Sequence, residues 1–171
     1  MNLKQYIHNY KDFPTEGIIF RDIFPLLRNP QAWTTVLKYF KKQCEETNPT
    51  LIAGIESRGF LLGAAVSSIT NIGFIPIRKK GKLPGDVTTL KYELEYGTSE
   101  LEIQSDILNN NERVLILDDL LATGGTASAA LKLVEKADAK VIGLGFIIEL
   151  TELNGREKFS EKIEIRSLLT Y

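Results

Sequence analysis

The chain has 171 residues, of which 43% are hydrophobic and 25% charged, and a formal net charge of −1. This is the composition of one globular domain, and it excludes a disordered or collagen-like chain. The balance of 21 Lys and Arg against 22 Asp and Glu excludes the broad basic face of a nucleic-acid-binding protein, although a local basic loop remains possible. One cysteine, Cys44, and one histidine, His8, exclude an intrachain disulfide and a His-pair metal centre. Acid–base chemistry must therefore depend mainly on carboxylates, lysines or tyrosines.

Apolar segments are short throughout the sequence. The best of them, residues 59–66, is far shorter than the roughly 20 apolar residues of a membrane-spanning helix. Residues 1–8 lack the apolar region and the cleavage site of a secretion signal. We therefore expect a cytoplasmic protein with neither a membrane nor a nucleic acid as its partner.

Hydrophobic periodicity and turn residues predict a chain in which strands alternate with helices. The predicted helices cover residues 3–10, 31–46, 59–70, 128–136 and 155–159. The predicted strands cover residues 51–55, 73–77, 113–117, 140–150 and 163–168. Trp33, Phe40 and Cys44 share one helical face and are expected in the core. This alternation implies a single α/β domain over residues 1–171, with a parallel five-stranded sheet flanked by helices.

Residues 78–97 interrupt this alternation. The segment is polar, holds Gly81, Pro84, Gly85 and Gly97, and has no sustained periodicity, which predicts a long loop with a hairpin possible through residues 101–103. Loops of this length are uncommon inside compact domains and often serve as functional lids. We therefore expect a flexible lid here.

The most informative segment follows the strand at residues 113–117. Asp118 and Asp119 precede a Thr-Gly-Gly-Thr turn, residues 123–126, which opens a helix. Two glycines allow consecutive N–H groups to face one concavity at the positive end of that helix, and this arrangement binds phosphate. The lysine of a Walker A loop is missing, which favours a terminal phosphate monoester over a nucleoside triphosphate. The two carboxylates would repel that phosphate, so vicinal sugar hydroxyls are their natural partners.

This segment resembles the signature by which type I phosphoribosyltransferases bind phosphoribosyl diphosphate (PRPP), in the form typical of the adenine-specific branch. Further blocks resemble that branch in the same order, namely residues 13–27, 54–60, 78–84 and 94–97. Together the blocks reach across essentially the whole chain. The resemblance implies a parallel five-stranded sheet, an N-terminal hood at about residues 1–30 over the base, the lid loop at 78–97, and a homodimer.

The resemblance also implies the reaction, in which adenine and PRPP give AMP and pyrophosphate. Mg²⁺, bound mainly through PRPP, would assist departure of the diphosphate from an oxocarbenium-like ribose, and no metal-binding side chain is assigned. The 5′-phosphate would lie on Ala122, Thr123, Gly124, Gly125 and Thr126, and the ribose on Asp118 and Asp119.

The remaining roles follow from the resemblance in the same way. Ser57, Arg58, Arg78, Lys79 and Lys82 would bind the diphosphate. Phe20 would stack on adenine, while the backbones of Ile19 and Arg21 would bind its edge. Glu95 would take the proton that the purine nitrogen loses, a role for which a carboxylate is chemically suited.

Each assignment has a simpler alternative from the residues alone. Residues 57–58 could be a solvated turn, residues 78–82 a solvated basic turn, and Phe20 a core residue. Glu95 could be a surface residue, and only the resemblance distinguishes it from Glu93. For the whole chain, the alternatives are transfer to another purine base, or a PRPP-sensing regulator without catalysis.

Overall fold

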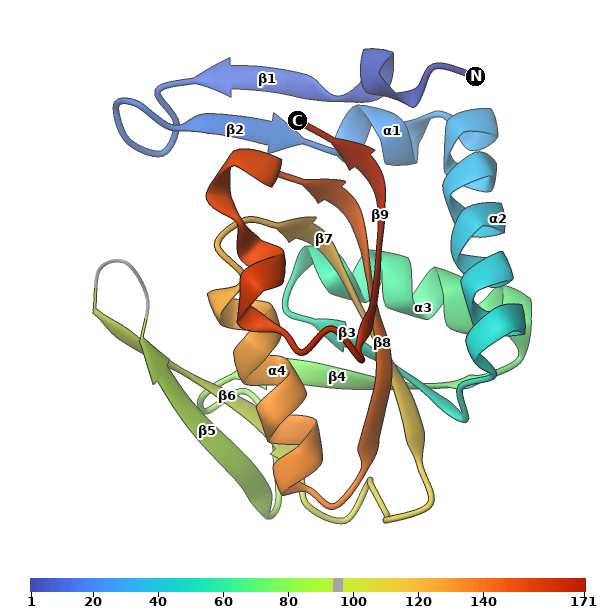
Figure 1. The fold of residues 1–171 in the computed structure, drawn as a ribbon, viewed down its shortest axis with the longest axis vertical. Coiled ribbons are helices and arrows are strands. Elements are labelled where there is room, and N and C mark those ends of the chain that lie inside the picture. The colour runs from blue at the N-terminus through green and yellow to red at the C-terminus, as the bar shows by residue number, and fades with distance from the viewer. Residues whose placement is uncertain (94–96) are drawn as a thin grey trace.

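The computed structural model describes residues 1–93 and 97–171, and a seven-stranded sheet forms its centre (Figure 1). The strand order is β5-β6-β4-β3-β7-β8-β9. Five adjacent strands are parallel: β4 (Gly73–Lys79), β3 (Leu51–Ile55), β7 (Arg113–Leu121), β8 (Lys140–Glu149) and β9 (Glu164–Thr170). The predicted α/β class and its five parallel strands are thus confirmed, but the prediction of five strands in all was too few.

The two additional strands form a hairpin, which the sequence indicated as possible at residues 101–103 but not over residues 87–93. Strand β5 (Val87–Glu93) pairs antiparallel with β6 (Thr98–Gln104), and β6 pairs antiparallel with the end of β4. Only one face of this hairpin packs on the core, through Leu90, Tyr92, Leu101 and Ile103. Since the other face is polar, the segment has no continuous apolar run, and its composition resembles that of a loop. The prediction of a loop over residues 87–93 was therefore wrong.

Helices cover both faces of the sheet (Figure 1). Their bounds are α1 (Phe24–Arg28), α2 (Pro30–Thr47), α3 (Arg58–Thr70) and α4 (Gly125–Lys136). The core cluster on one face includes side chains of α2 and α3, whereas the cluster on the other face includes those of α4. Helix α2 begins where the Asn29 side chain accepts hydrogen bonds from the N–H groups of Gln31 and Ala32, which a Pro at the first position reinforces.

The predicted core residues of α2 lie against the sheet. Phe40 and Cys44 are buried, and Trp33 is partly buried in the same cluster. Burial raises the pKa of the Cys44 thiol to about 11, which leaves it protonated and unreactive at neutral pH. No helix within residues 1–93 or 97–171 is long and apolar enough to cross a membrane.

The N-terminal segment forms a small separate sheet. A 3-10 helix, η1 (Leu3–Tyr6), replaces the longer helix predicted there, and β1 (His8–Lys11) pairs antiparallel with β2 (Ile19–Asp22). This sheet lies beside the C-terminus (Figure 1), where the Lys4 Nζ donates to the Thr170 carbonyl at 2.6 Å. Two short 3-10 helices, η2 (Thr151–Leu153) and η3 (Gly155–Lys158), precede β9.

Candidate active site

A cavity of about 480 Å³ opens at the carboxyl ends of β3 and β7. Ligands of open α/β sheets bind at this edge. Of the residues singled out in the sequence, ten line the cavity: Ser57, Arg58, Lys79, Asp118, Asp119 and the five residues of the segment 122–126. Side chains that lie far apart in the sequence, each selected for polyanion or sugar binding, therefore meet in one place.

The segment Ala122–Thr126, here called the phosphate loop, leads from β7 into α4. Gly124 is the N-cap of α4 and has a φ of +79°, a conformation that favours glycine. No side chain caps this helix, and the N–H groups of a first helical turn have no partners within the helix. These N–H groups, with the positive end of the helix dipole, suit a phosphate group.

Asp118 and Asp119 lie within β7, which continues to Leu121, four residues beyond the predicted end of the strand. Asp119 is only 5% exposed, and its Oδ2 lies 2.9 Å from the Arg58 Nε. Burial, and next the charge of Asp119, raises the pKa of Asp118 well above its usual range. Burial also raises the pKa of Asp119, while Arg58 opposes that rise. Asp118 is therefore the member of the pair that keeps its proton to higher pH.

The turn after β3 lies directly against the acidic pair. A Cβ on Gly59 would come within 2.8 Å of both the Asp118 Oδ1 and the Leu117 carbonyl oxygen, so only glycine allows this approach. The Arg58 guanidinium lies 4.9 Å from the centre of the Phe20 ring. Arg58 therefore connects the N-terminal sheet with Asp119 across the cavity.

The cations of the basic segment at residues 78–82 have different surroundings, since two form ion pairs with carboxylates and one lines the cavity. The Arg78 Nε and Nη2 each lie 3.2 Å from a carboxylate oxygen of Glu56, and its Nη1 donates to the Lys82 carbonyl at 3.0 Å. The Lys80 Nζ lies 2.8 Å from Glu100. Of the four cations in this segment, only Lys79 lines the cavity. The diphosphate roles of Arg78 and Lys82 stay predictions.

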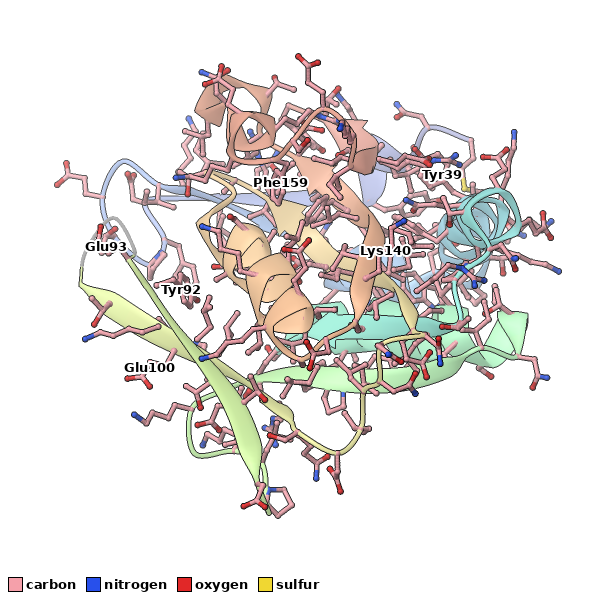
Figure 2. The ribbon with its side chains drawn as sticks, turned by 60° about the horizontal axis from the view of Figure 1, so that its bottom comes forward. Tyr39, Tyr92, Glu93, Glu100, Lys140 and Phe159 are labelled. Carbon is pink, nitrogen blue, oxygen red and sulfur yellow. The ribbon has the colours of Figure 1, made fainter. Side chains whose placement is uncertain are left out.

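Glu56 and Tyr92 line the cavity but have no role in the sequence analysis. Glu56 accepts from the Lys79 N–H at 2.9 Å as well as from Arg78, and so joins the turn after β3 to the end of β4. The Tyr92 hydroxyl lies 3.5 Å from the Thr126 Oγ1, and Tyr92 and Glu93 end β5 (Figure 2). Glu56 lies within a block that carried the resemblance, whereas nothing in the pattern around Tyr92 sets it apart.

The predicted base-binding residues lie beside this cavity and do not line it. Phe20 is half-buried, packs edge-on against Phe13 at 5.3 Å and belongs to neither core cluster, so its alternative role as a core residue is wrong. Arg21 turns its guanidinium onto the Tyr171 ring at 4.2 Å. Ile19 is 45% exposed. Glu95 falls outside the described residues.

The described residues suit a metal ion that binds together with a substrate rather than one held by side chains alone. Within the described ranges, no group of three or more His, Cys, Asp or Glu side chains is placed to hold a metal. The cavity does present Asp118, Asp119 and the phosphate loop together. Such a site suits a cation that arrives with a diphosphate, since Mg²⁺ is usually held by substrate phosphates and a few carboxylates.

Comparison with known proteins defines the class of protein. The family model of the phosphoribosyl transferase domain matches residues 25–168, and the chain belongs to this family. The curated relatives that match the whole chain point to one branch of this family. The adenine phosphoribosyltransferase of Prochlorococcus marinus (strain MIT 9313) is 51% identical over 171 residues, which cover 100% of this chain and 99% of the relative.

Solved structures agree with this assignment. The adenine phosphoribosyltransferase of Thermoanaerobacter pseudethanolicus is 44% identical, with a TM-score of 0.95 over 99% of this chain and 98% of that one. The enzyme of Saccharomyces cerevisiae, solved with an imino-altritol bisphosphate and adenine, is 40% identical, with a TM-score of 0.92 over 97% and 96% of the two chains.

Proposed function

We propose that this protein is an adenine phosphoribosyltransferase, which converts adenine and PRPP to AMP and pyrophosphate in the cytoplasm. The proposal rests on one cavity in which the phosphate loop, the acidic pair and the Ser57–Arg58 turn meet. PRPP carries a phosphate monoester, a vicinal diol and a diphosphate, and the cavity offers a suitable group for each. Full-length relatives with this activity, at about half identity, support the same substrate.

The phosphate loop binds the 5′-phosphate of PRPP in this proposal. The N–H groups of the first turn of α4 and the hydroxyls of Thr123 and Thr126 supply donors to it. Asp118 and Asp119 accept hydrogen bonds from the 2′- and 3′-hydroxyls, and these bonds favour the charged carboxylate and so lower the raised pKa of Asp118. These contacts place C1 of the ribose opposite the turn after β3.

The diphosphate leaves toward Ser57, Arg58 and Lys79. The bond between C1 and the diphosphate oxygen breaks, and a bond from C1 to the adenine nitrogen forms. Cationic side chains stabilise the charge that develops on the leaving group. A divalent cation, when bound with PRPP, adds Lewis-acid stabilisation of the same oxygens. Lys82 and Arg78 belong to the same basic segment, and we propose that it binds the diphosphate as a unit.

Adenine lies under the N-terminal sheet, with Phe20 against its ring. The backbones of Ile19 and Arg21 read its edge, since a carbonyl accepts from the exocyclic amine of adenine but not from a 6-oxo purine. Hydrogen-bond recognition of this kind can discriminate by roughly 10⁴–10⁵. Glu95 takes the proton that the adenine N–H loses as the new bond forms.

The substrate is tested by product formation from PRPP and Mg²⁺ with adenine, hypoxanthine, guanine or xanthine in parallel. We expect AMP and pyrophosphate in equal amounts from adenine alone. If a nucleotide forms from another base and not from adenine, that base is the substrate. PRPP binding without a nucleotide from any base would overturn the enzyme proposal in favour of a PRPP sensor.

A further inference from the structure

The phosphate loop rests on a segment that has no substrate-binding role in the proposal. Gly155, the first residue of η3, packs backbone to backbone against it. A Cβ on Gly155 would collide with the Ala122 carbonyl oxygen, and a Cβ on Gly124 would collide with the Gly155 carbonyl oxygen. Two glycines from different parts of the chain therefore meet with no side chain between them, and the backbone of η3 supports the phosphate loop directly.

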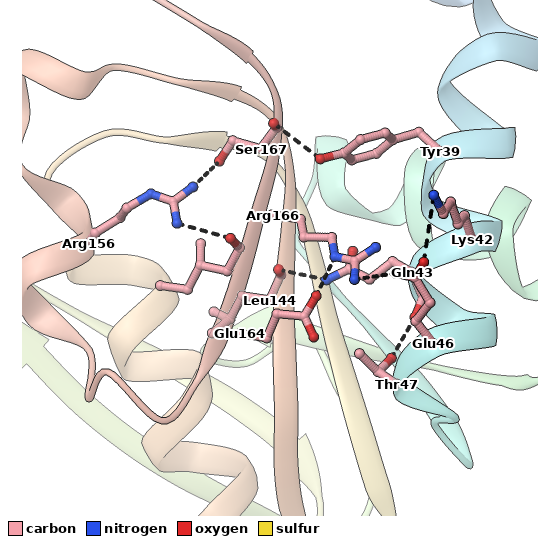
Figure 3. A network of polar contacts seen from close by, with 11 residues as sticks. Tyr39, Lys42, Gln43, Glu46, Thr47, Leu144, Arg156, Glu164, Arg166 and Ser167 are labelled. Atoms are coloured by element: carbon pink, nitrogen blue, oxygen red, sulfur yellow. Dashed lines mark hydrogen bonds and ion pairs between the residues drawn. The ribbon is translucent and has the colours of Figure 1, made fainter.

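Arg156, the residue after Gly155, holds η3 in place. Its Nε and Nη2 lie 2.7 and 2.8 Å from the two carboxylate oxygens of Glu149, a bidentate pair. Its Nη1 donates to the Ile165 carbonyl at 2.9 Å, and its Nη2 lies 3.3 Å from the Ser167 Oγ (Figure 3). One guanidinium thus ties η3 to both β8 and β9.

Glu149, the acidic member of this pair, is held in place at the end of β8. It is only 5% exposed, and it lies directly opposite Leu121, the last residue of β7 before the phosphate loop. The next residue, Leu150, donates its N–H to the Leu121 carbonyl at 2.9 Å. Hydrogen bonds from Arg156 hold the pKa of Glu149 below its usual value, so the carboxylate is charged at neutral pH.

We propose that the Arg156–Glu149 pair positions the phosphate loop for the 5′-phosphate of PRPP, by holding the Gly155 backbone against Ala122 and Gly124. Arg156 and Glu149 are positioning residues, because neither lines the cavity. The inference deepens the proposed function and rests on its placement of the 5′-phosphate.

The first test replaces Arg156 with Gln. We expect KM for PRPP to rise roughly tenfold or more, since a small misplacement of a positioned group costs up to about a hundredfold. KM for adenine should change little, since the N-terminal sheet is not part of this contact. An unchanged KM for PRPP in a folded variant would overturn the proposal.

A buried unpaired Glu149 could destabilise Arg156→Gln, so the double variant Arg156→Gln/Glu149→Gln is measured beside it. The double variant removes the unpaired charge and should regain thermal stability, while its KM for PRPP stays high. If KM for PRPP recovers together with stability, the pair has only a structural role.

Arg166 provides a matched control. This arginine of β9 also bridges two carboxylates, those of Glu46 and Glu164, but it faces α2 (Figure 3). Arg166→Gln should lower thermal stability and leave KM for PRPP near the wild-type value. An equal rise of KM for PRPP in this control would contradict a specific role for Arg156.

Binding of ribose 5-phosphate, measured by calorimetry, separates this inference from the proposed function. It needs neither adenine nor catalysis, so it tests the phosphate loop even if the wild-type protein makes no AMP. We expect Arg156→Gln to weaken it roughly tenfold, and Arg166→Gln to leave it unchanged. Equal affinity in both variants would overturn the inference, whatever the outcome of the product assay.

Discussion

Asp118 and Asp119 are neighbours in β7, yet their surroundings differ. Asp119 has Arg58 at 2.9 Å, while Asp118 is the partner whose pKa burial and the charge of Asp119 raise most clearly. An acid whose pKa is higher in the folded protein than in the unfolded chain favours folding only while it is protonated. Its contribution is therefore lost as pH rises from the unfolded value of about 3.9 through the folded pKa. The charged form of Asp118, which accepts hydrogen bonds from the ribose in the proposal, therefore lowers the stability of the fold.

Replacing Asp118 with Asn should therefore stabilise the protein at neutral pH and raise KM for PRPP. The gain in the free energy of unfolding should grow with pH above about 4, because Asn has no proton to lose. Urea unfolding of both proteins at several pH values measures it. Asp119→Asn is the comparison, since it leaves Arg58 without a carboxylate and should gain less. A destabilised Asp118→Asn at neutral pH would contradict this account.

Glu95 is the residue on which the proposed proton transfer depends. Glu95→Ala should lower kcat by roughly 10²–10⁴-fold, the usual contribution of a general acid–base group. Glu93→Ala is the control, because Glu93 is an exposed residue at the end of β5 and has no role in the proposal. Steady-state kinetics with saturating PRPP decides between them. Equal losses in the two variants would remove the special role of Glu95.

At the scale of elements, the close approach of α3 to β7 shapes the site. A side chain on Gly59 would meet the Asp118 carboxylate and the Leu117 carbonyl at 2.8 Å. Gly59→Ala should therefore cost roughly 1–3 kcal/mol of stability, as overpacking does, and should weaken PRPP binding. Denaturant unfolding and PRPP titration measure the two effects. Gly73→Ala is the control, because Gly73 begins β4 away from the cavity and a Cβ there would meet only the Leu51 side chain, at 3.1 Å. Wild-type PRPP affinity in Gly59→Ala would contradict this prediction.

Elements with a strong apolar pattern could be predicted from the sequence. Strand β3 has the predicted bounds, and α2 differs from the prediction by one residue at each end. The N-terminal pairing of β1 with β2 could not be predicted, because all four residues of β1 are exposed and give no apolar alternation. Strand β5 was missed for a related reason, since only one face of the β5–β6 hairpin is covered.

The site was predictable to the extent that its residues form local motifs. The phosphate loop and the acidic pair follow one another in the sequence, and both line the cavity as expected from a strand–turn–helix. The ion pairs of Arg78 and Lys80 with Glu56 and Glu100 could not be predicted, because they join segments that only the fold brings together. Only the folded structure therefore shows that Arg78 and Lys80 form ion pairs, whereas Lys79 lines the cavity.

At the scale of the whole molecule, we propose that two copies associate. The N-terminal hairpin and the start of α1 expose large apolar side chains, namely Tyr10, Phe13, Ile18, Ile19 and Phe24. Apolar clusters of this kind often mark interaction sites. Sedimentation equilibrium should therefore give twice the 19.2 kDa chain mass. A fully active species with the mass of one chain would contradict the dimer.

In the proposed complex the cavity holds the phosphate and the ribose, and the base lies beside it under the N-terminal sheet. A crystal structure with AMP tests this most directly. We expect the phosphate on residues 122–126, the ribose hydroxyls on Asp118 and Asp119, and the adenine ring beside Phe20. AMP bound with its phosphate away from the phosphate loop, or with its base outside the N-terminal sheet, would contradict it.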